Sequence, residues 1–174
     1  MVWIVGLDIG QARDPSALCA LEADTALPIP ERIYRCRALK RWPLGTPYRA
    51  VAADVARIIK TYLKDGCQLA LDFTGPGRPV AEDIQHAIYA ANARIQAFSA
   101  VTITAGQGVT TGTDGTPHVS KLWLTSCFQT VLQNGRLKIA TTLPEARTLI
   151  REMRVLKIKL TTAGAESFAG QGPR

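Results

Sequence analysis

The sequence predicts an α/β domain with a mixed five-stranded sheet, in which three antiparallel strands precede βαβα crossovers and helices cover both faces. Short, continuously apolar runs over residues 2–8 and 68–72 are typical of central strands that are buried on both faces. Residues 32–42 alternate between polar and apolar side chains, which is the pattern of an outer strand. Residues 46–63 and 79–91 carry apolar side chains at helical spacing.

Length and composition are those of an ordinary globular domain. With 174 residues, of which 47% are hydrophobic and 20% charged, the chain can bury about 70% of its extended surface. No apolar run approaches the ~20 residues that cross a bilayer, and residues 1–10 lack the basic start of a signal peptide. The four cysteines form no CxxC pair and no cluster with histidine, which argues against a zinc site and a disulfide framework. We therefore expect a cytoplasmic protein with no membrane partner.

The formal net charge of +7 is unevenly distributed along the chain. Residues 31–60 and residues 118–160 each contain eight Lys or Arg and two Asp or Glu, a charge of +6 for each segment. The remaining segments are acidic or neutral. Two basic segments around an acidic remainder indicate a polyanion partner. Solvated helix faces would explain the same excess equally well.

The first three strands are expected to form an antiparallel meander. Residues 2–8 form the first, and an Asp-Pro turn leads to the second at residues 16–22, because proline disfavours the helical conformation of the residue before it. On the third strand Arg35, Arg37 and Arg41 are predicted to share one solvated face.

Two helices then alternate with two strands. Thr46 is expected to cap the first helix, with Pro47 at its first position. The fourth strand, residues 68–72, ends on Asp72, and the second helix begins at Pro79.

The rest of the chain is predicted to contain one more sheet strand and a smaller annex. Its expected segments are a strand at 95–105, a Gly- and Thr-rich hairpin at 106–117, a helix at 120–133, an extended segment at 136–140, a helix at 144–154 and an extended segment at 155–160. This succession is the one used by RNase H-like folds. We therefore expect an RNase H-like domain over residues 1–160 and a frayed tail over residues 161–174.

Asp8 and Asp72 are the strongest candidates for chemistry. Each ends a strand that is predicted to be buried, and ligands of α/β sheets bind beyond the carboxyl ends of the strands. Two carboxylates there repel each other unless a cation or a shared proton lies between them. Carboxylate oxygens suit Mg²⁺ or Mn²⁺. The alternative is that each aspartate only accepts backbone N–H groups from the turn that follows it.

Other motifs are less specific. The Asp-Ile-Gly turn at residues 8–10 resembles the phosphate-binding turn of sugar kinases and actin-like ATPases, but the sequence contains no P-loop. His86 is expected at the surface of the second helix, and His118 lies just before a helix start, where it could face a phosphate. Lys121 is either a phosphate contact or a solvated helix residue.

Five stretches carry a resemblance to a known family: GLDIGQARDPSALCALE, RALKRWPLGTPY, LALDFTGPGRPV, TPHVSKLWL and GRLKIATTLPEARTLIREM. In these stretches, which follow the family's order over roughly residues 4–160, the chain resembles the C-terminal nuclease domain of the phage terminase large subunit, the DNA-packaging enzyme. The second and third stretches are particularly characteristic. The resemblance implies an RNase H-like fold and a metal-dependent endonuclease that cuts concatemeric DNA.

The resemblance also implies roles for individual residues. Asp8 and Asp72 match two catalytic, metal-binding carboxylates, so that Asp8 would bridge two Mg²⁺ or Mn²⁺ ions and Asp72 would hold one. Arg78 and Lys121 fall inside matching stretches and are expected to contact DNA phosphates. The implied reaction is two-metal hydrolysis of a phosphodiester.

Basic side chains outside the carboxylate site are expected to hold the DNA. Arg35 and Arg37 on the third strand, together with the basic residues of the segment 118–160, would grip backbone phosphates without reading sequence. Double-stranded DNA is the implied partner, with the terminase ATPase domain, the small terminase subunit and the portal as further partners in the cytoplasm of a bacterial host.

The sequence departs from the family pattern at its end. Family members continue with a His-Asp-Asp-Leu-type motif that opens a final helix and supplies a third acid, whereas this sequence ends at residue 174. Glu145, Glu152 and Glu166 are candidate substitutes outside that motif. We therefore expect a truncated prophage product, one part of a split gene or a fragment prepared for expression, with weak metal affinity and little or no cleavage by the chain alone.

Three rival functions stay open at this point. A non-catalytic DNA-binding or assembly remnant of the packaging machinery would bind DNA regardless of Mg²⁺. An actin-like phosphotransferase would bind ATP, and a Holliday-junction resolvase would share the fold.

Overall fold

The computed structural model describes residues 1–10, 13–74, 78–113, 115–155, 157–160 and 166–169. Its centre is one eight-stranded mixed sheet in the order β6-β7-β5-β4-β1-β2-β3-β8. The strands of this sheet are β1 (Val2–Asp8), β2 (Ala17–Ala23), β3 (Tyr34–Arg41), β4 (Cys67–Asp72), β5 (Ile95–Thr104), β6 (Val109–Thr111), β7 (Pro117–Ser120) and β8 (Leu137–Ile139). The helices are α1 (Tyr48–Tyr62), α2 (Arg78–Ala90), α3 (Lys121–Gln133) and α4 (Ala146–Val155), with a 3₁₀ turn η1 (Ile29–Glu31).

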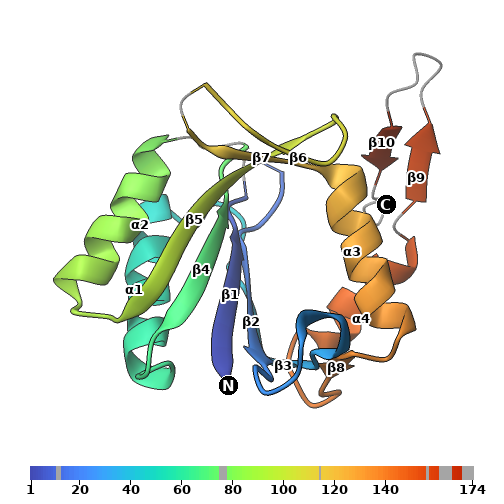
Figure 1. Ribbon diagram of the computed structural model, residues 1–174. Helices are drawn as coiled ribbons and strands as arrows, with labels where there is room; N and C mark the ends of the chain where they lie inside the picture. Colours follow the sequence, from blue (N-terminus) through green and yellow to red (C-terminus); the bar gives the residue numbers. More distant parts are fainter. Residues whose placement is uncertain (11–12, 75–77, 114, 156, 161–165, 170–174) are drawn as a thin grey trace.

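The predicted fold class is confirmed. The first three strands pair antiparallel, and β4 and β5 then add in parallel beside β1, as the hairpins and crossovers require. Helices α1 and α2 lie on one side of the sheet, and α3 and α4 lie on the other (Figure 1). The five predicted strands form the middle of the sheet, and the short strands β6, β7 and β8 extend it at its two edges.

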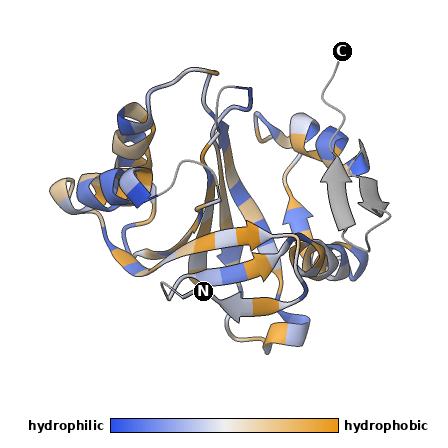
Figure 2. Ribbon diagram, turned by 90° about the horizontal axis from the view of Figure 1, so that it is seen from above, coloured by the Kyte–Doolittle hydropathy of each residue, from blue (hydrophilic) through white to orange (hydrophobic). Residues whose placement is uncertain are grey.

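The main core lies between the sheet and the pair α1 and α2. Val5 and Leu7 of β1 and Leu69 and Leu71 of β4 face these helices and are almost completely buried. The helices contribute apolar side chains at helical spacing, namely Val51, Ala52, Val55, Ala56 and Ile59 from α1 and Val80, Ala81, Ile84 and Ile88 from α2. In Figure 2 the hydrophobic colours accordingly run along the central strands.

The start of α1 differs from the prediction. Pro47 is the N-cap residue, and no side chain caps the helix. Thr46 does not act as the cap, because its hydroxyl donates a hydrogen bond of 2.6 Å to the carbonyl of Pro43. Ser120, by contrast, caps α3 through its Oγ, which accepts from the backbone N–H of Trp123 at 3.0 Å.

A β-bulge in β3 overturns the prediction that Arg35, Arg37 and Arg41 share one face. The register with β2 shifts between Ala20 and Leu21, which inserts one extra residue into β3 and reverses the alternation. Arg37 consequently pairs with Glu22, at 2.6 Å. Arg41 instead reaches the opposite side of the sheet and pairs with Glu152 on α4.

The end of the chain is also more regular than expected. Within the segment 161–174, Glu166–Ala169 forms β10, which pairs antiparallel with β9 (Lys157–Leu160) in a separate two-stranded sheet. The other residues of that segment lie outside the described residues. Within the described part of the chain, no helix is long and apolar enough to span a membrane.

Candidate active site

Asp8 and Asp72 lie side by side at the carboxyl ends of two adjacent parallel strands. The register between β1 and β4 pairs Leu7 with Leu71, so that the two aspartates are the next residues of each strand. Their side chains face away from α1 and α2, because alternate residues of a strand point to opposite faces. Both aspartates line a cavity of about 460 Å³ on this face.

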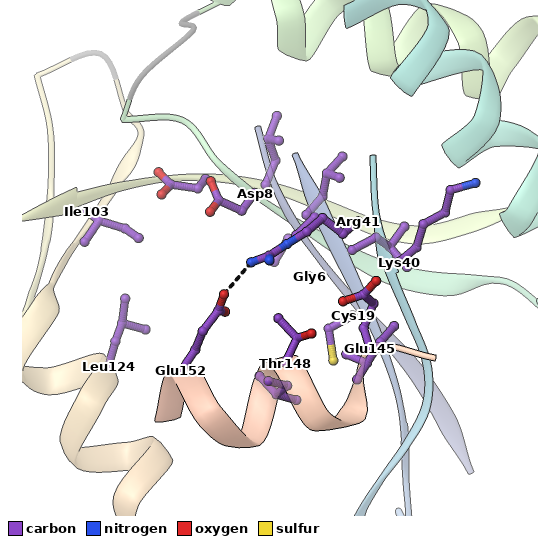
Figure 3. A pocket seen from close by; sticks show the side chains of 18 of the residues that line it. Gly6, Asp8, Cys19, Lys40, Arg41, Ile103, Leu124, Glu145, Thr148 and Glu152 are labelled. Carbon is purple, nitrogen blue, oxygen red and sulfur yellow. Dashed lines mark hydrogen bonds and ion pairs between the residues drawn. The ribbon is translucent and has the colours of Figure 1, made fainter. Parts of the chain in front are cut away.

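The floor of the cavity is made of small residues on the central strands. These residues are Gly6, Ala17 and Ala70, whose small size leaves open space above the sheet. The opposite wall comes from the annex, through Leu124 of α3 and residues of α4 (Figure 3). The cavity lining is mainly apolar, and its acidic residues are Asp8, Asp72, Glu145 and Glu152.

Asp72 is fixed by the turn that follows β4. Its Oδ1 accepts the backbone N–H of Thr74 at 2.9 Å, which is the local turn interaction considered as the alternative for this residue. The hydroxyl of Thr74 in turn accepts the backbone N–H of Ile103 at 2.8 Å. One carboxylate oxygen of Asp72 is therefore held in place, and the other has no hydrogen bond within the described part of the chain.

Asp8 experiences an environment that opposes its negative charge. Loss of hydration among the strand ends raises the pKa of Asp8, and repulsion from Asp72 and then from Asp14 raises it further. Two carboxylates that line one cavity repel each other, and a bound cation would relieve this repulsion. This donor set of carboxylate oxygens fits Mg²⁺ or Mn²⁺.

Two basic residues, Lys40 and Arg41, line the cavity; Lys40 pairs with Asp54 of α1, and Arg41 was not assigned to the site from the sequence. The strand registers pair Asp8 with Ala17 and Ala17 with Arg41, so one row across the sheet runs from Asp72 to Arg41. In Figure 3 the Arg41 side chain extends toward Glu152, and its Nη2 lies 2.6 Å from Glu152 Oε1. The bulge in β3 decides this orientation, and no pattern in the sequence marks the bulge.

The three glutamates considered as a third acid have different positions. Glu145 and Glu152 line the cavity from α4. Glu166 lies in β10, whose side chains lie outside the described part of the structure. Among the described residues, no three Asp, Glu, His or Cys side chains come close enough together to hold one ion.

The residues expected to bind nucleic acid fall into two groups. Arg78 opens α2 and Lys121 opens α3, so both follow strands at the end of the sheet that carries Asp72, although neither lines the cavity. Arg35 and Arg37 lie elsewhere, near the start of β3 and on the opposite face from Asp8.

The two histidines lie outside the cavity. His86 is exposed on α2, as predicted. His118 is half-buried on β7, where it pairs with Thr102 of β5. The structure therefore brings Asp8 and Asp72 together with Arg41 and Glu152, and leaves both histidines apart.

Comparison with solved structures finds the same fold in large terminase nuclease domains. The nuclease domain of the large terminase of Thermus phage P74-26 has a TM-score of 0.61 at 16% sequence identity, over 98% of this chain and 70% of that one. The human cytomegalovirus terminase nuclease domain has a TM-score of 0.60 at 12% identity, over 90% of this chain and 74% of that one. The large terminase of bacteriophage HK97 has a TM-score of 0.56 at 16% identity, and 96% of this chain covers 35% of it. No protein-family model and no curated protein matches the sequence.

Proposed function

We propose that this chain is a divalent-metal-dependent DNA endonuclease domain of a DNA-packaging terminase. The observation that carries the proposal is the juxtaposition of Asp8 and Asp72 at adjacent strand ends in the lining of one cavity, where burial and neighbouring carboxylates raise the pKa of Asp8. The fold shared with phage and viral terminase nuclease domains supports the choice of reaction. A structure of the cytomegalovirus domain, with a TM-score of 0.59, was soaked with Mn.

In the proposed mechanism the two carboxylates hold the metal and the surrounding residues position the DNA. Asp8 and Asp72 would hold the metal, and the Thr74 N–H keeps the Asp72 carboxylate oriented. Bound divalent ions would lower the pKa of a water molecule and stabilise the charge on the leaving oxygen. Arg78 and Lys121, at the same end of the sheet, hold backbone phosphates without reading bases.

The proposed activity is weak. Metal sites in nucleases depend on several anionic oxygens, whereas no third Asp, Glu, His or Cys among the described residues lies close enough to Asp8 and Asp72 to share one ion. We therefore expect slow cleavage that needs millimolar metal. The terminase ATPase domain, the small terminase subunit and the portal are proposed partners because the chain shares its fold with terminase nuclease domains.

Nicking of supercoiled plasmid in Mn²⁺ tests this function. We expect slow nicking by the wild type and none by Asp8→Asn or Asp72→Asn. Asp14→Asn is the matched control, because it removes the same charge near Asp8 from a residue outside the cavity lining. If Asp8→Asn and Asp72→Asn both still nick the plasmid, Asp8 and Asp72 are not the catalytic carboxylates. Rapid nicking that Asp8→Asn abolishes would support the site and refute the predicted weakness.

The second candidate is a non-catalytic DNA-binding or assembly component. The two segments of charge +6, residues 31–60 and 118–160, favour it. It predicts salt-sensitive binding to duplex DNA that is the same in Mg²⁺ and in EDTA, with no nicking at any metal concentration. Asp8→Asn would leave this binding unchanged or strengthen it.

A further inference from the structure

The two basic segments of the sequence meet at the β3–β8 edge of the sheet. β8 pairs in parallel with the start of β3, and this register places Arg35 directly beside Lys138. The loop that carries η1 lies next to the same two strands (Figure 1). The sheet edge therefore gathers cations from segments that lie about a hundred residues apart in the sequence.

Three arginines at this edge have buried nitrogen atoms without an acceptor. They are Arg32, just before β3, Arg35 within it, and Arg136, just before β8. Arg32 Nε, Arg35 Nη1 and Arg136 Nε are buried and have no hydrogen-bond partner among the described atoms. A buried N–H group that lacks an acceptor costs about 1–3 kcal/mol of folding free energy. Such groups in native proteins usually have a partner, so an acceptor from outside the chain is expected here.

Contacts with the protein hold two of these guanidinium groups in place. Arg136 Nη1 donates to the carbonyls of Ile29 at 3.1 Å and Arg32 at 3.3 Å. Arg32 Nη2 donates to the carbonyl of Leu27 at 3.4 Å. These bonds orient the guanidinium groups without neutralising them, because a carbonyl carries no charge and a guanidinium does not lose its proton.

The carboxylates of this region do not compensate the three arginines. Glu22, which lies opposite Arg35 in the register with β2, is paired with Arg37 at 2.6 Å. Within the described part of the chain, no ion pair involves Arg32, Arg35 or Arg136. The ion pairs among the described residues therefore leave the charge of these three arginines unpaired.

We propose that Arg32, Arg35 and Arg136 form a binding site for a phosphate group. Guanidinium groups present planar pairs of N–H donors that match phosphate oxygens, and a phosphate supplies both the acceptors and the charge that the cluster lacks. Free phosphate and the phosphodiesters of a DNA backbone share this chemistry. A water molecule would satisfy the N–H groups but would leave the charge unbalanced.

This site is separate from the carboxylate cavity. Glu22, the partner of Arg35, lies five residues along β2 from Ala17, the partner of Asp8, and at about 3.4 Å per residue this separation is about 17 Å. The two sites also lie on opposite faces of the sheet. Phosphate binding at the cluster is therefore independent of whether the chain cleaves DNA.

Thermal unfolding of the whole chain in sodium phosphate, compared with sodium chloride of equal ionic strength, tests the site. We expect 10 mM phosphate to raise the Tm of the wild type by about 2–4 °C. Arg35→Gln is the key variant, since the Nη1 group of Arg35 has no hydrogen-bond partner among the described atoms that the substitution would remove. Arg49→Gln is the matched control, because Arg49 lies on α1 outside the cluster and its side chain is 89% exposed.

Arg35→Gln should weaken phosphate binding at least tenfold in calorimetry, whereas Arg49→Gln should change it less than twofold. A phosphate effect no larger than that of chloride would overturn the proposal, as would equal losses in both variants. A binding assay with labelled duplex DNA separates the two sources of phosphate. If the site contacts DNA, Arg35→Gln should weaken DNA binding and reduce by about one the number of ions released on binding, measured from the dependence of affinity on salt concentration. If the site binds only free phosphate, Arg35→Gln should leave the DNA affinity unchanged.

Discussion

Arg41 on β3 and Glu152 on α4 form an ion pair of 2.6 Å that joins the sheet to the annex across the cavity. Arg41 lies in the same row of the sheet as Asp8, with only the small Ala17 between them. Arg41 of the cavity lining is thus engaged by an acid of the opposite wall (Figure 3).

Glu152→Gln should increase the affinity for duplex DNA two- to fivefold at low salt, because it releases Arg41 and removes a negative charge from the cavity. Both partners are well exposed, 36% and 49% for Arg41 and Glu152, so the ion pair itself contributes about 0–1 kcal/mol. We therefore expect the Tm to change by less than about 3 °C. Fluorescence anisotropy with a labelled duplex measures the affinity, and Arg41→Gln should shift it in the opposite direction. Equal affinities for all three proteins would show that Arg41 does not contact DNA.

Asp8→Asn should stabilise the protein at neutral pH. The folded state raises the pKa of Asp8 above its ordinary value of 3.8, so ionising this carboxyl costs more in the folded than in the unfolded chain. The cost is absent below pH 3.8 and fully present above the folded-state pKa. We expect the variant to exceed the wild-type Tm by a few degrees at pH 7, and this difference to vanish as the pH falls toward 4. A lower Tm for the variant at pH 7 would contradict the repulsion between Asp8 and Asp72.

Asp54→Asn should destabilise the protein and make it less sensitive to acid. Burial alone would raise the pKa of Asp54, but hydrogen bonds from Lys40, Arg57 and Trp42 outweigh it and lower that pKa. The carboxylate therefore contributes to the free energy of unfolding above pH 3.8, and this contribution is lost as the pH falls through the folded-state pKa. We expect a loss of about 1–3 kcal/mol at pH 7 in urea unfolding.

The control for Asp54 is Asp83→Asn. Asp83 lies 3.7 Å from Arg49, whose side chain is 89% exposed, so its ion pair should contribute less than about 0.5 kcal/mol. Equal losses in the two variants would mean that the contacts with Lys40, Trp42 and Arg57 do not stabilise the end of β3 on α1.

Gly6→Leu tests whether the cavity is used. A Cβ at Gly6 would meet no atom within 4 Å, and its backbone needs no left-handed conformation, so the leucine can enter the cavity without strain. We expect the Tm to stay within about 2 °C of the wild type while nicking in Mn²⁺ falls at least tenfold, because the side chain occupies the space beside Asp8. Gly6→Ala should retain most of the activity. Unchanged nicking by Gly6→Leu would place the reaction outside this cavity.

The central part of the fold follows from local patterns in the sequence. The apolar runs that end at Asp8 and Asp72, and the helical stripes of α1 and α2, specify buried strands and their covering helices. Right-handed parallel crossovers then place β4 beside β1, which brings the two aspartates together. This geometry is confirmed, whereas the catalytic role of the pair stays a prediction.

The features that could not be predicted depend on contacts between distant segments. The bulge in β3 changes which face Arg35, Arg37 and Arg41 occupy, and one inserted residue leaves no periodic signal. The pairing of β8 with β3 is equally non-local, since it joins residue 35 to residue 138. The only sign in the sequence of the phosphate site proposed at that edge is therefore the positive charge of residues 31–60 and 118–160.

Titration of the wild-type chain with Mn²⁺ by isothermal calorimetry is the most direct test that the two strand-end carboxylates form a cation site. We expect binding with a Kd on the order of 10⁻³ M, at least tenfold weaker binding for Asp8→Asn and for Asp72→Asn, and a change of less than threefold for Asp14→Asn. Equal Mn²⁺ affinities in all four proteins would contradict a metal site between Asp8 and Asp72. The same holds if the wild type binds no Mn²⁺ at a Mn²⁺ concentration about 20-fold above the expected Kd.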